Sequence, residues 1–144
     1  MRVFVCCFLM VGIFIVALGS AQWAGAGDSS AYDALIAAQA QASGVPASVI
    51  RRVIMRESRY NARAVSSGNY GLMQIRLGTA RAMGYSGSAA GLLDPTTNMT
   101  YAVRYLAGAY RAAGGNESRA VALYARGYYW QAKTQGFSPY ASAQ

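Results

Sequence analysis

The sequence has 144 residues, enough for one domain, and its formal net charge is +8. It contains no histidine, and its only cysteines, Cys6 and Cys7, lie in the first stretch of the chain. Residues 27–144 therefore lack the usual soft metal ligands and have no Ser-His or Cys-His nucleophile pair. Any chemistry there depends on carboxylates, hydroxyls, amides or arginine, and we expect neither a metal nor another cofactor.

Thirteen basic residues stand against five acidic ones. A domain with this balance is attracted to polyanions, and nucleic acid, lipopolysaccharide and peptidoglycan are all candidates. The same charge would also serve solubility alone, so charge by itself does not select a partner.

Residues 1–26 have the layout of a secretory signal peptide. Arg2 gives a short positive start, residues 3–18 are almost entirely apolar, and small residues follow. Residues 24–26 (Ala-Gly-Ala) fit an A-x-A cleavage site, and residues 19–21 are a second candidate. The apolar run is shorter than the ~20 residues that a spanning helix needs. We therefore expect cleavage rather than a permanent membrane anchor, and a periplasmic or secreted protein.

Helical patterns account for most of residues 27–144. The spacing of apolar residues, together with capping residues and glycine or proline boundaries, predicts helices over residues 31–43, 46–59, 79–83, 95–113 and 116–125. Residues 61–71 and 84–93 have the composition of loops. No alternating strand pattern and no internal repeat is visible, so we expect one mainly α domain over residues 27–144.

Glu57 is the exception in the charge pattern of the second helix. At about 100° per residue, Glu57 lies in the middle of an apolar arc made by Val49, Ile50, Val53 and Ile54. The arginines of this helix lie on the other side. Loss of hydration and the dipole at the helix C-terminus would both raise the pKa of Glu57, as a general acid for glycosidic cleavage requires. The alternative is that the helix ends early and Glu57 pairs with Arg56 or Arg59.

The other four carboxylates have plainer explanations. Asp94 precedes a proline as a helix cap, Glu117 lies in a first turn, and Asp28 and Asp33 belong to the leader and the first helix. Ordinary glycosidases place two carboxyl groups across the scissile bond. With one good candidate, either the substrate assists the reaction or the chain is not an enzyme.

Two motifs resemble the soluble lytic transglycosylase family. Glu57-Ser58 is similar to its E-S motif, and residues 71–75 (Gly-Leu-Met-Gln-Ile) are similar to its G-L-M-Q motif. Residues 92–98 and 103–106 also match its pattern, so the resemblance spans roughly residues 31–127. It implies a lysozyme-like fold with a groove for glycan. It also implies cleavage between N-acetylmuramic acid and N-acetylglucosamine without water, leaving 1,6-anhydro ends.

The resemblance also implies roles for single residues. Glu57 would protonate the leaving oxygen and then act as base while the 6-hydroxyl of the sugar attacks, assisted by the N-acetyl group of the muramic acid. Ser58 would orient Glu57, Met73 and Gln74 would line the groove and contact sugar, and Tyr124 would lie near Glu57. The plainer alternatives are a helix-end hydroxyl for Ser58, solvent exposure for Gln74, and core positions for Met73 and Tyr124.

The sequence departs from the family pattern at two places. Arg76-Leu77 replaces the usual Met-Pro after the G-L-M-Q-I run, and Ala125 replaces the asparagine of a downstream A-x-Y-N-x-G pattern. Any amide contact from the second position is lost. Nearby residues that would compensate are Arg126, Tyr128, Tyr129 and Trp130, whose aromatic rings could stack on sugars or cover a small core.

Three rival functions remain open on the sequence. The first is a hydrolytic muramidase, which cuts the same bond with water. The second is a catalytically weak glycan-binding domain, for which Ala125 is the best support. The third is a basic structural partner of a secretion apparatus. The expected partner is the glycan strand of peptidoglycan rather than nucleic acid, with the chain acting as a monomer that opens the wall for a larger machine such as a secretion apparatus.

Overall fold

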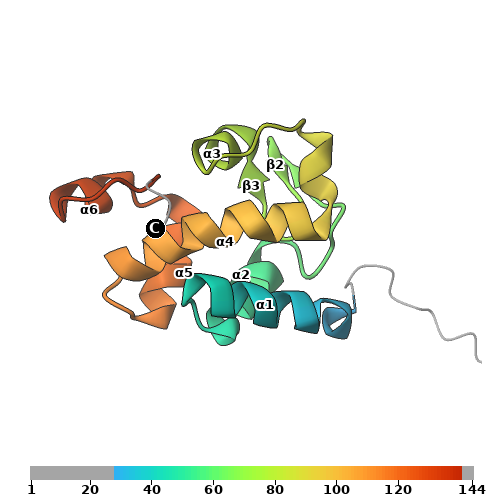
Figure 1. Ribbon diagram of the computed structural model, residues 1–144, viewed down its shortest axis with the longest axis horizontal. Coiled ribbons are helices and arrows are strands. Elements are labelled where there is room, and N and C mark those ends of the chain that lie inside the picture. Colours follow the sequence, from blue (N-terminus) through green and yellow to red (C-terminus); the bar gives the residue numbers. More distant parts are fainter. Residues whose placement is uncertain (1–27, 141–144) are drawn as a thin grey trace, which may run out of the picture.

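The computed structural model describes residues 28–140, so the signal peptide predicted for residues 1–26 lies outside the described part (Figure 1). The α-helices of this part are α1 (Asp33–Ser43), α2 (Ala47–Glu57), α3 (Leu77–Ala82), α4 (Pro95–Ala112), α5 (Glu117–Arg126) and α6 (Tyr129–Thr134). Short 3-10 helices cover Ser29–Tyr32 and Ala90–Leu93. The strands β1 (Val65–Ser66), β2 (Asn69–Tyr70) and β3 (Ile75–Arg76) form one antiparallel sheet in the order β1-β2-β3.

The mainly α fold predicted from the sequence is confirmed, with two corrections. The sheet was not predicted, because strands of two residues are too short to show an alternating pattern. Helix α6 was not predicted either, because its six residues carry no clear period. In the part of the chain that the structure describes, no helix is both long and apolar enough to cross a membrane.

Helix α4 is the centre of the fold. It runs across the molecule, with α1 and α2 on one side and α3 with the sheet on the other (Figure 1). Its buried residues form the middle of the core: Asn98, Met99, Ala102, Val103, Leu106, Ala107, Gly108, Ala109 and Ala112. Many of them are small, which lets α1 and α5 approach closely. Helix α4 thus connects the helices on one side of the molecule to α3 and the segment before it on the other.

Helix α2 sorts its side chains as the helical wheel predicted. Its four aliphatic residues are fully buried, while Arg51 and Arg52 face outward and contact Asp33 and Glu117 at 2.6 and 3.7 Å. Glu57 is the last residue of the helix, so the helix does not end before it. The pairing with Arg56 considered in the same alternative is present, with Arg56 Nε 3.6 Å from Glu57 Oε1. Arg59 follows with a φ of 51°, a left-handed conformation that turns the chain away from the helix axis.

The segment between β2 and β3 is held by Asn98. This side chain is fully buried, accepts a hydrogen bond from the Met73 amide at 2.9 Å, and donates to the Tyr70 and Leu92 carbonyls at 2.7 and 2.8 Å. Gly71 lies against it with a φ of 71°, and a Cβ added there would collide with Asn98. One amide thus fixes the conformation of the G-L-M-Q segment.

Candidate active site

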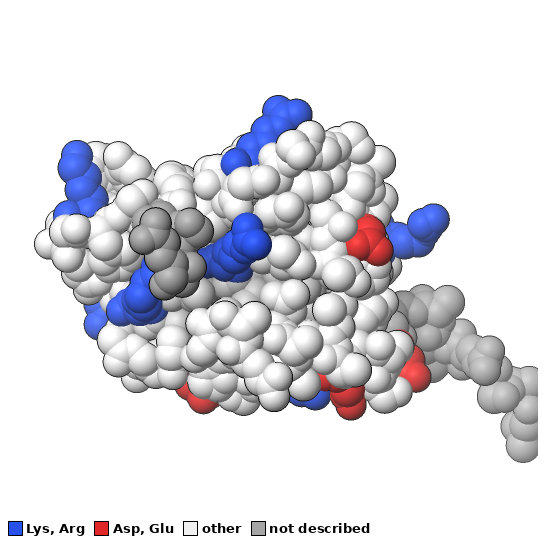
Figure 2. All heavy atoms as spheres, viewed as in Figure 1, with Lys and Arg blue, Asp and Glu red and all other residues white. Residues whose placement is uncertain are grey.

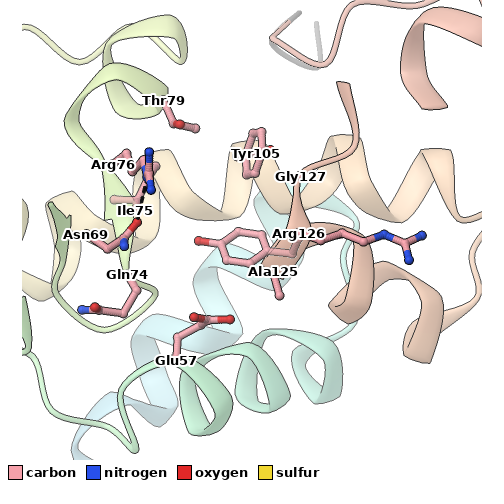
Figure 3. Close-up of a pocket in the computed structure, with 11 residues that line it drawn as sticks. Glu57, Asn69, Gln74, Ile75, Arg76, Thr79, Tyr105, Ala125, Arg126 and Gly127 are labelled. Atoms are coloured by element: carbon pink, nitrogen blue, oxygen red, sulfur yellow. Dashed lines mark hydrogen bonds between the residues drawn. The ribbon is translucent and has the colours of Figure 1, made fainter. Parts of the chain in front are cut away.

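A pocket of about 450 Å³ lies between the end of α2, the sheet and the end of α5 (Figure 3). Its lining residues come from segments far apart in the sequence: Glu57, Asn69, Gln74, Ile75, Arg76, Thr79, Tyr105, Tyr124, Ala125, Arg126 and Gly127. The carboxyl group of Glu57 points into the space between Gln74 on the sheet side and Ala125 on the α5 side. Glu57 is the one acidic residue in this lining.

The Glu57 carboxyl group is partly buried. Its side chain is 21% exposed, and Oε1 is buried with no hydrogen-bond partner among residues 28–140. The nearest cation is Arg56, whose Nε lies 3.6 Å from Oε1, too far for a good hydrogen bond. Burial raises the pKa of Glu57, and the attraction of Arg56 opposes this only in part. The predicted direction of the pKa shift is confirmed.

The other four carboxylates lie outside this pocket, and they cap helices or form ion pairs. Asp94 accepts a hydrogen bond from the Thr97 amide at 2.7 Å as the cap of α4, and Asp28 accepts one from the Ser30 amide at 3.0 Å. Asp33 and Glu117 take part in the ion pairs with α2. The pocket therefore offers a single acid for chemistry.

Comparison with known families agrees with this arrangement. Residues 34–138 match the model of the Transglycosylase SLT domain, which covers more than half of the chain. The chain belongs to the transglycosylase SLT domain family. The resemblance drawn from the E-S and G-L-M-Q motifs is thereby confirmed, and with it a lysozyme-like, mainly α fold and an enzyme of the lytic transglycosylase type that acts on peptidoglycan. No solved structure matches the chain.

Gln74 of this SLT domain lies in the pocket lining, on the wall opposite α5. Its φ of 50° is unusual for a residue other than glycine. The side-chain amide donates hydrogen bonds to the Ala64 and Gly71 carbonyls at 3.0 and 2.9 Å, which hold this conformation. Gln74 thus shapes the wall of the pocket that faces Glu57.

We expect Gln74→Glu to destabilise the SLT domain by about 2 kcal/mol at neutral pH. A carboxylate cannot donate to the Ala64 and Gly71 carbonyls and would repel both. Protonation at acidic pH restores one donor, so part of the loss should be recovered there. Urea unfolding at both pH values tests this, with Gln41→Glu on the exposed face of α1 as the matched control. Equal stability of the two variants at neutral pH would contradict the expectation.

Tyr124 ties α5 to the G-L-M-Q segment. Its ring is buried at the pocket, and its hydroxyl donates to the Met73 carbonyl at 2.8 Å. Burial raises the pKa of Tyr124 well above its ordinary value, and the nearby carboxyl group of Glu57 acts in the same direction. Both effects favour the protonated hydroxyl, which is the form that donates to the Met73 carbonyl.

Ser58 and Met73 are not among the lining residues of the pocket. Met73 was expected to line the groove, whereas Ser58 was expected to orient Glu57. The Ser58 hydroxyl donates to the Leu72 carbonyl at 2.7 Å, so it is turned away from the pocket towards the backbone of the G-L-M-Q segment. The Met73 side chain is fully buried in the core, and its amide and carbonyl are both hydrogen bonded. Both residues hold the sheet-side wall in place beside Glu57.

Several lining residues of the SLT domain were not predicted as site residues. Asn69 and Thr79 belong to segments with no catalytic pattern of their own, so only the fold brings them to the pocket of Glu57. Tyr105 lies in residues 103–106, which match the family pattern, but that match gave no sign of a place in the site. The Arg76 Nε donates to Asn69 Oδ1 at 3.3 Å across β2 and β3, drawn as a dashed line in Figure 3. Asn98 belongs to the matched residues 92–98, but its role in holding the G-L-M-Q segment was not predicted. That role depends on hydrogen bonds to residues 6 to 28 positions away in the sequence.

Proposed function

We propose that this chain cleaves the bond between N-acetylmuramic acid and N-acetylglucosamine in peptidoglycan without water, leaving 1,6-anhydromuramic ends. The observation that supports this is the solitary, half-buried Glu57 in a pocket without a second carboxylate. Water-using glycosidases commonly need two carboxyl groups. A reaction in which the substrate supplies its own nucleophile needs only one.

In the first step the protonated Glu57 donates its proton to the bridging oxygen, and the bond from C1 of the muramic acid to this oxygen breaks. Burial raises the pKa of Glu57, which favours the protonated form that this step needs. The carbonyl oxygen of the neighbouring N-acetyl group stabilises the positive charge that develops at C1. The leaving strand departs with a free 4-hydroxyl group.

In the second step the 6-hydroxyl oxygen of the same muramic acid bonds to C1. The Glu57 carboxylate accepts the proton that this hydroxyl group loses. The acid is regenerated, and no water is consumed. Gln74 and Tyr124 would border the sugar next to Glu57, and Ser58 acts as a positioning residue through Leu72. We also propose that the protein works outside the cytoplasm, after removal of residues 1–26.

The products formed in water enriched in oxygen-18 test this proposal. The protein is incubated with purified peptidoglycan, and the released muropeptides are analysed by mass spectrometry. We expect 1,6-anhydro ends without label. Labelled reducing ends as the main product would replace this reaction with that of a hydrolytic muramidase. Binding of glycan without any cleavage would leave a binding domain and would direct attention to Ala125 in the pocket lining.

We expect cleavage to be independent of metal ions. The sequence has no histidine, and no group of three or more potential metal-binding side chains occurs among residues 28–140. Activity should be the same before and after dialysis against a chelator. Loss of cleavage that a divalent ion restores would contradict this expectation.

A further inference from the structure

The surface of the candidate active site continues beyond its pocket towards α6. A second pocket, of about 340 Å³, shares Tyr105, Arg126 and Gly127 with the first. Its remaining lining residues come from the end of α5, from α6 and from the segment after it. Figure 3 shows Arg126 extending away from Glu57, along the side where α5 ends. A strand lying over Glu57 therefore has a continuous surface to follow past Arg126.

Exposed aromatic rings border this second pocket. Tyr129, Trp130 and Tyr140 are 46, 71 and 40% exposed, and we call these three residues the aromatic ledge. Five large hydrophobic residues are exposed among those that the structure describes, and three of them belong to the ledge. Tyr128 alone fulfils the core-covering role considered for this cluster, since it is 2% exposed. Such grouping of exposed aromatic side chains is typical of a binding surface.

The ledge is attached firmly to α4. The Tyr128 hydroxyl lies 2.8 Å from both the Tyr105 and Pro139 carbonyls and above Gly108, where any Cβ would displace it. Ala132 of α6 is fully buried, and the side-chain amide of Gln135 donates to the Ala112 carbonyl at 3.2 Å. The backbone that carries the aromatic rings is thus anchored to α4 before a ligand arrives, which lowers the cost of binding.

The charges around the ledge fit an anionic strand. Arg126 lies where the two pockets meet, and Lys133 Nζ lies 5.3 Å from the centre of the Trp130 ring. The sequence has no acidic residue after Glu117. The acidic side chains visible in Figure 2 lie along the lower edge and the right-hand side, away from α6 at the upper left. The ledge contains no carboxylate side chain, so it would not repel the carboxylates of a muramic acid strand.

We propose that the aromatic ledge is an additional glycan subsite, which holds a sugar unit of the strand that is cleaved at Glu57. The apolar face of the sugar ring would stack on Trp130 beside Tyr129, and Arg126 would bind a carboxylate of a muramic acid unit between the two pockets. The proposal rests on the function proposed above. Such a subsite would make the protein prefer long strands over short fragments.

The test compares binding and cleavage of muramic acid strands of different length. Trp130→Ala, Trp130→Phe and Met55→Ala are each made in the active protein and in Glu57→Gln, which is expected to bind without cleaving. Met55 is 53% exposed and lies on α2 outside both pockets, so it serves as the matched control. Circular dichroism verifies that each variant is folded, as expected for substitutions at exposed positions.

We expect Trp130→Ala to weaken binding of long strands by about fivefold or more. Cleavage of the smallest fragment that the unchanged protein cuts should stay the same, and Trp130→Phe should retain most of the affinity. Equal affinity of Trp130→Ala and Met55→Ala for long strands would overturn the subsite, even if cleavage is normal. Absence of cleavage by the unchanged protein would overturn only the proposed reaction, since binding to Glu57→Gln still decides the subsite.

Discussion

Glu57→Gln is expected to abolish glycan cleavage while leaving the fold intact. The substitution preserves the shape of the side chain, but an amide cannot deliver the proton to the leaving oxygen. Loss of a general acid lowers the rate by about 10²–10⁴-fold, and here the same group also serves as the base. Cleavage is measured as soluble muropeptides released from purified peptidoglycan, and the fold is verified by circular dichroism.

Glu117→Gln is the matched control for this prediction. Glu117 lies in the first turn of α5, where it accepts a hydrogen bond from Ser48 at 3.2 Å and faces Arg52, outside the pocket. The control should cleave as fast as the unchanged protein. Undiminished cleavage by Glu57→Gln would exclude both the transglycosylase reaction proposed here and hydrolysis by the same acid.

The raised pKa of Glu57 has a consequence for stability. Between its ordinary pKa and its raised value, the folded protein binds more protons at Glu57 than the unfolded chain does. The contribution of Glu57 to the free energy of unfolding therefore falls as the pH rises through this window. Glu57→Gln lacks this dependence, so the variant should gain stability relative to the unchanged protein at neutral pH but not at acidic pH. Urea unfolding at both pH values measures the difference.

Asn98→Ala is expected to lower the free energy of unfolding by about 3 kcal/mol or more. The substitution leaves the Met73 amide and the carbonyls of Tyr70 and Leu92 without their hydrogen-bond partner in the core. Buried polar groups without a partner cost far more than the net value of the hydrogen bonds that they lose. The G-L-M-Q segment also loses its support, so cleavage should fall together with stability.

Asn116→Ala is the control for the asparagine substitution. Asn116 is the exposed cap of α5, where its side chain accepts a hydrogen bond from the Arg119 amide at 2.9 Å. Loss of such a cap costs about 1 kcal/mol and should leave cleavage unchanged. Thermal and urea unfolding of the two variants measure the contrast. A loss for Asn98→Ala no larger than that for Asn116→Ala would show that water replaces the buried amide.

The long helices and the position of Glu57 could be predicted from the sequence, because they depend on local rules. The apolar period of residues 95–113, the Asp94-Pro95 start and the Gly44 stop all act within a few residues. The place of Glu57 in the apolar arc is likewise a property of one helix. Its position on this face was enough to predict that Glu57 is partly buried and that its pKa is raised, and the structure agrees with both.

Only the tertiary structure decided which side chains of the motifs reach the pocket. Ser58 and Met73 belong to the recognised pattern, yet one is turned towards the Leu72 carbonyl and the other is buried in the core. These orientations depend on partners distant in sequence, such as Tyr124, which is 51 residues from the Met73 carbonyl that it contacts. A helical period records which face of one element is buried, but not which neighbour covers it. The sequence alone therefore determined the long helices and the buried face on which Glu57 lies, while packing around α4 decided the walls of the pocket and the aromatic surface beside it.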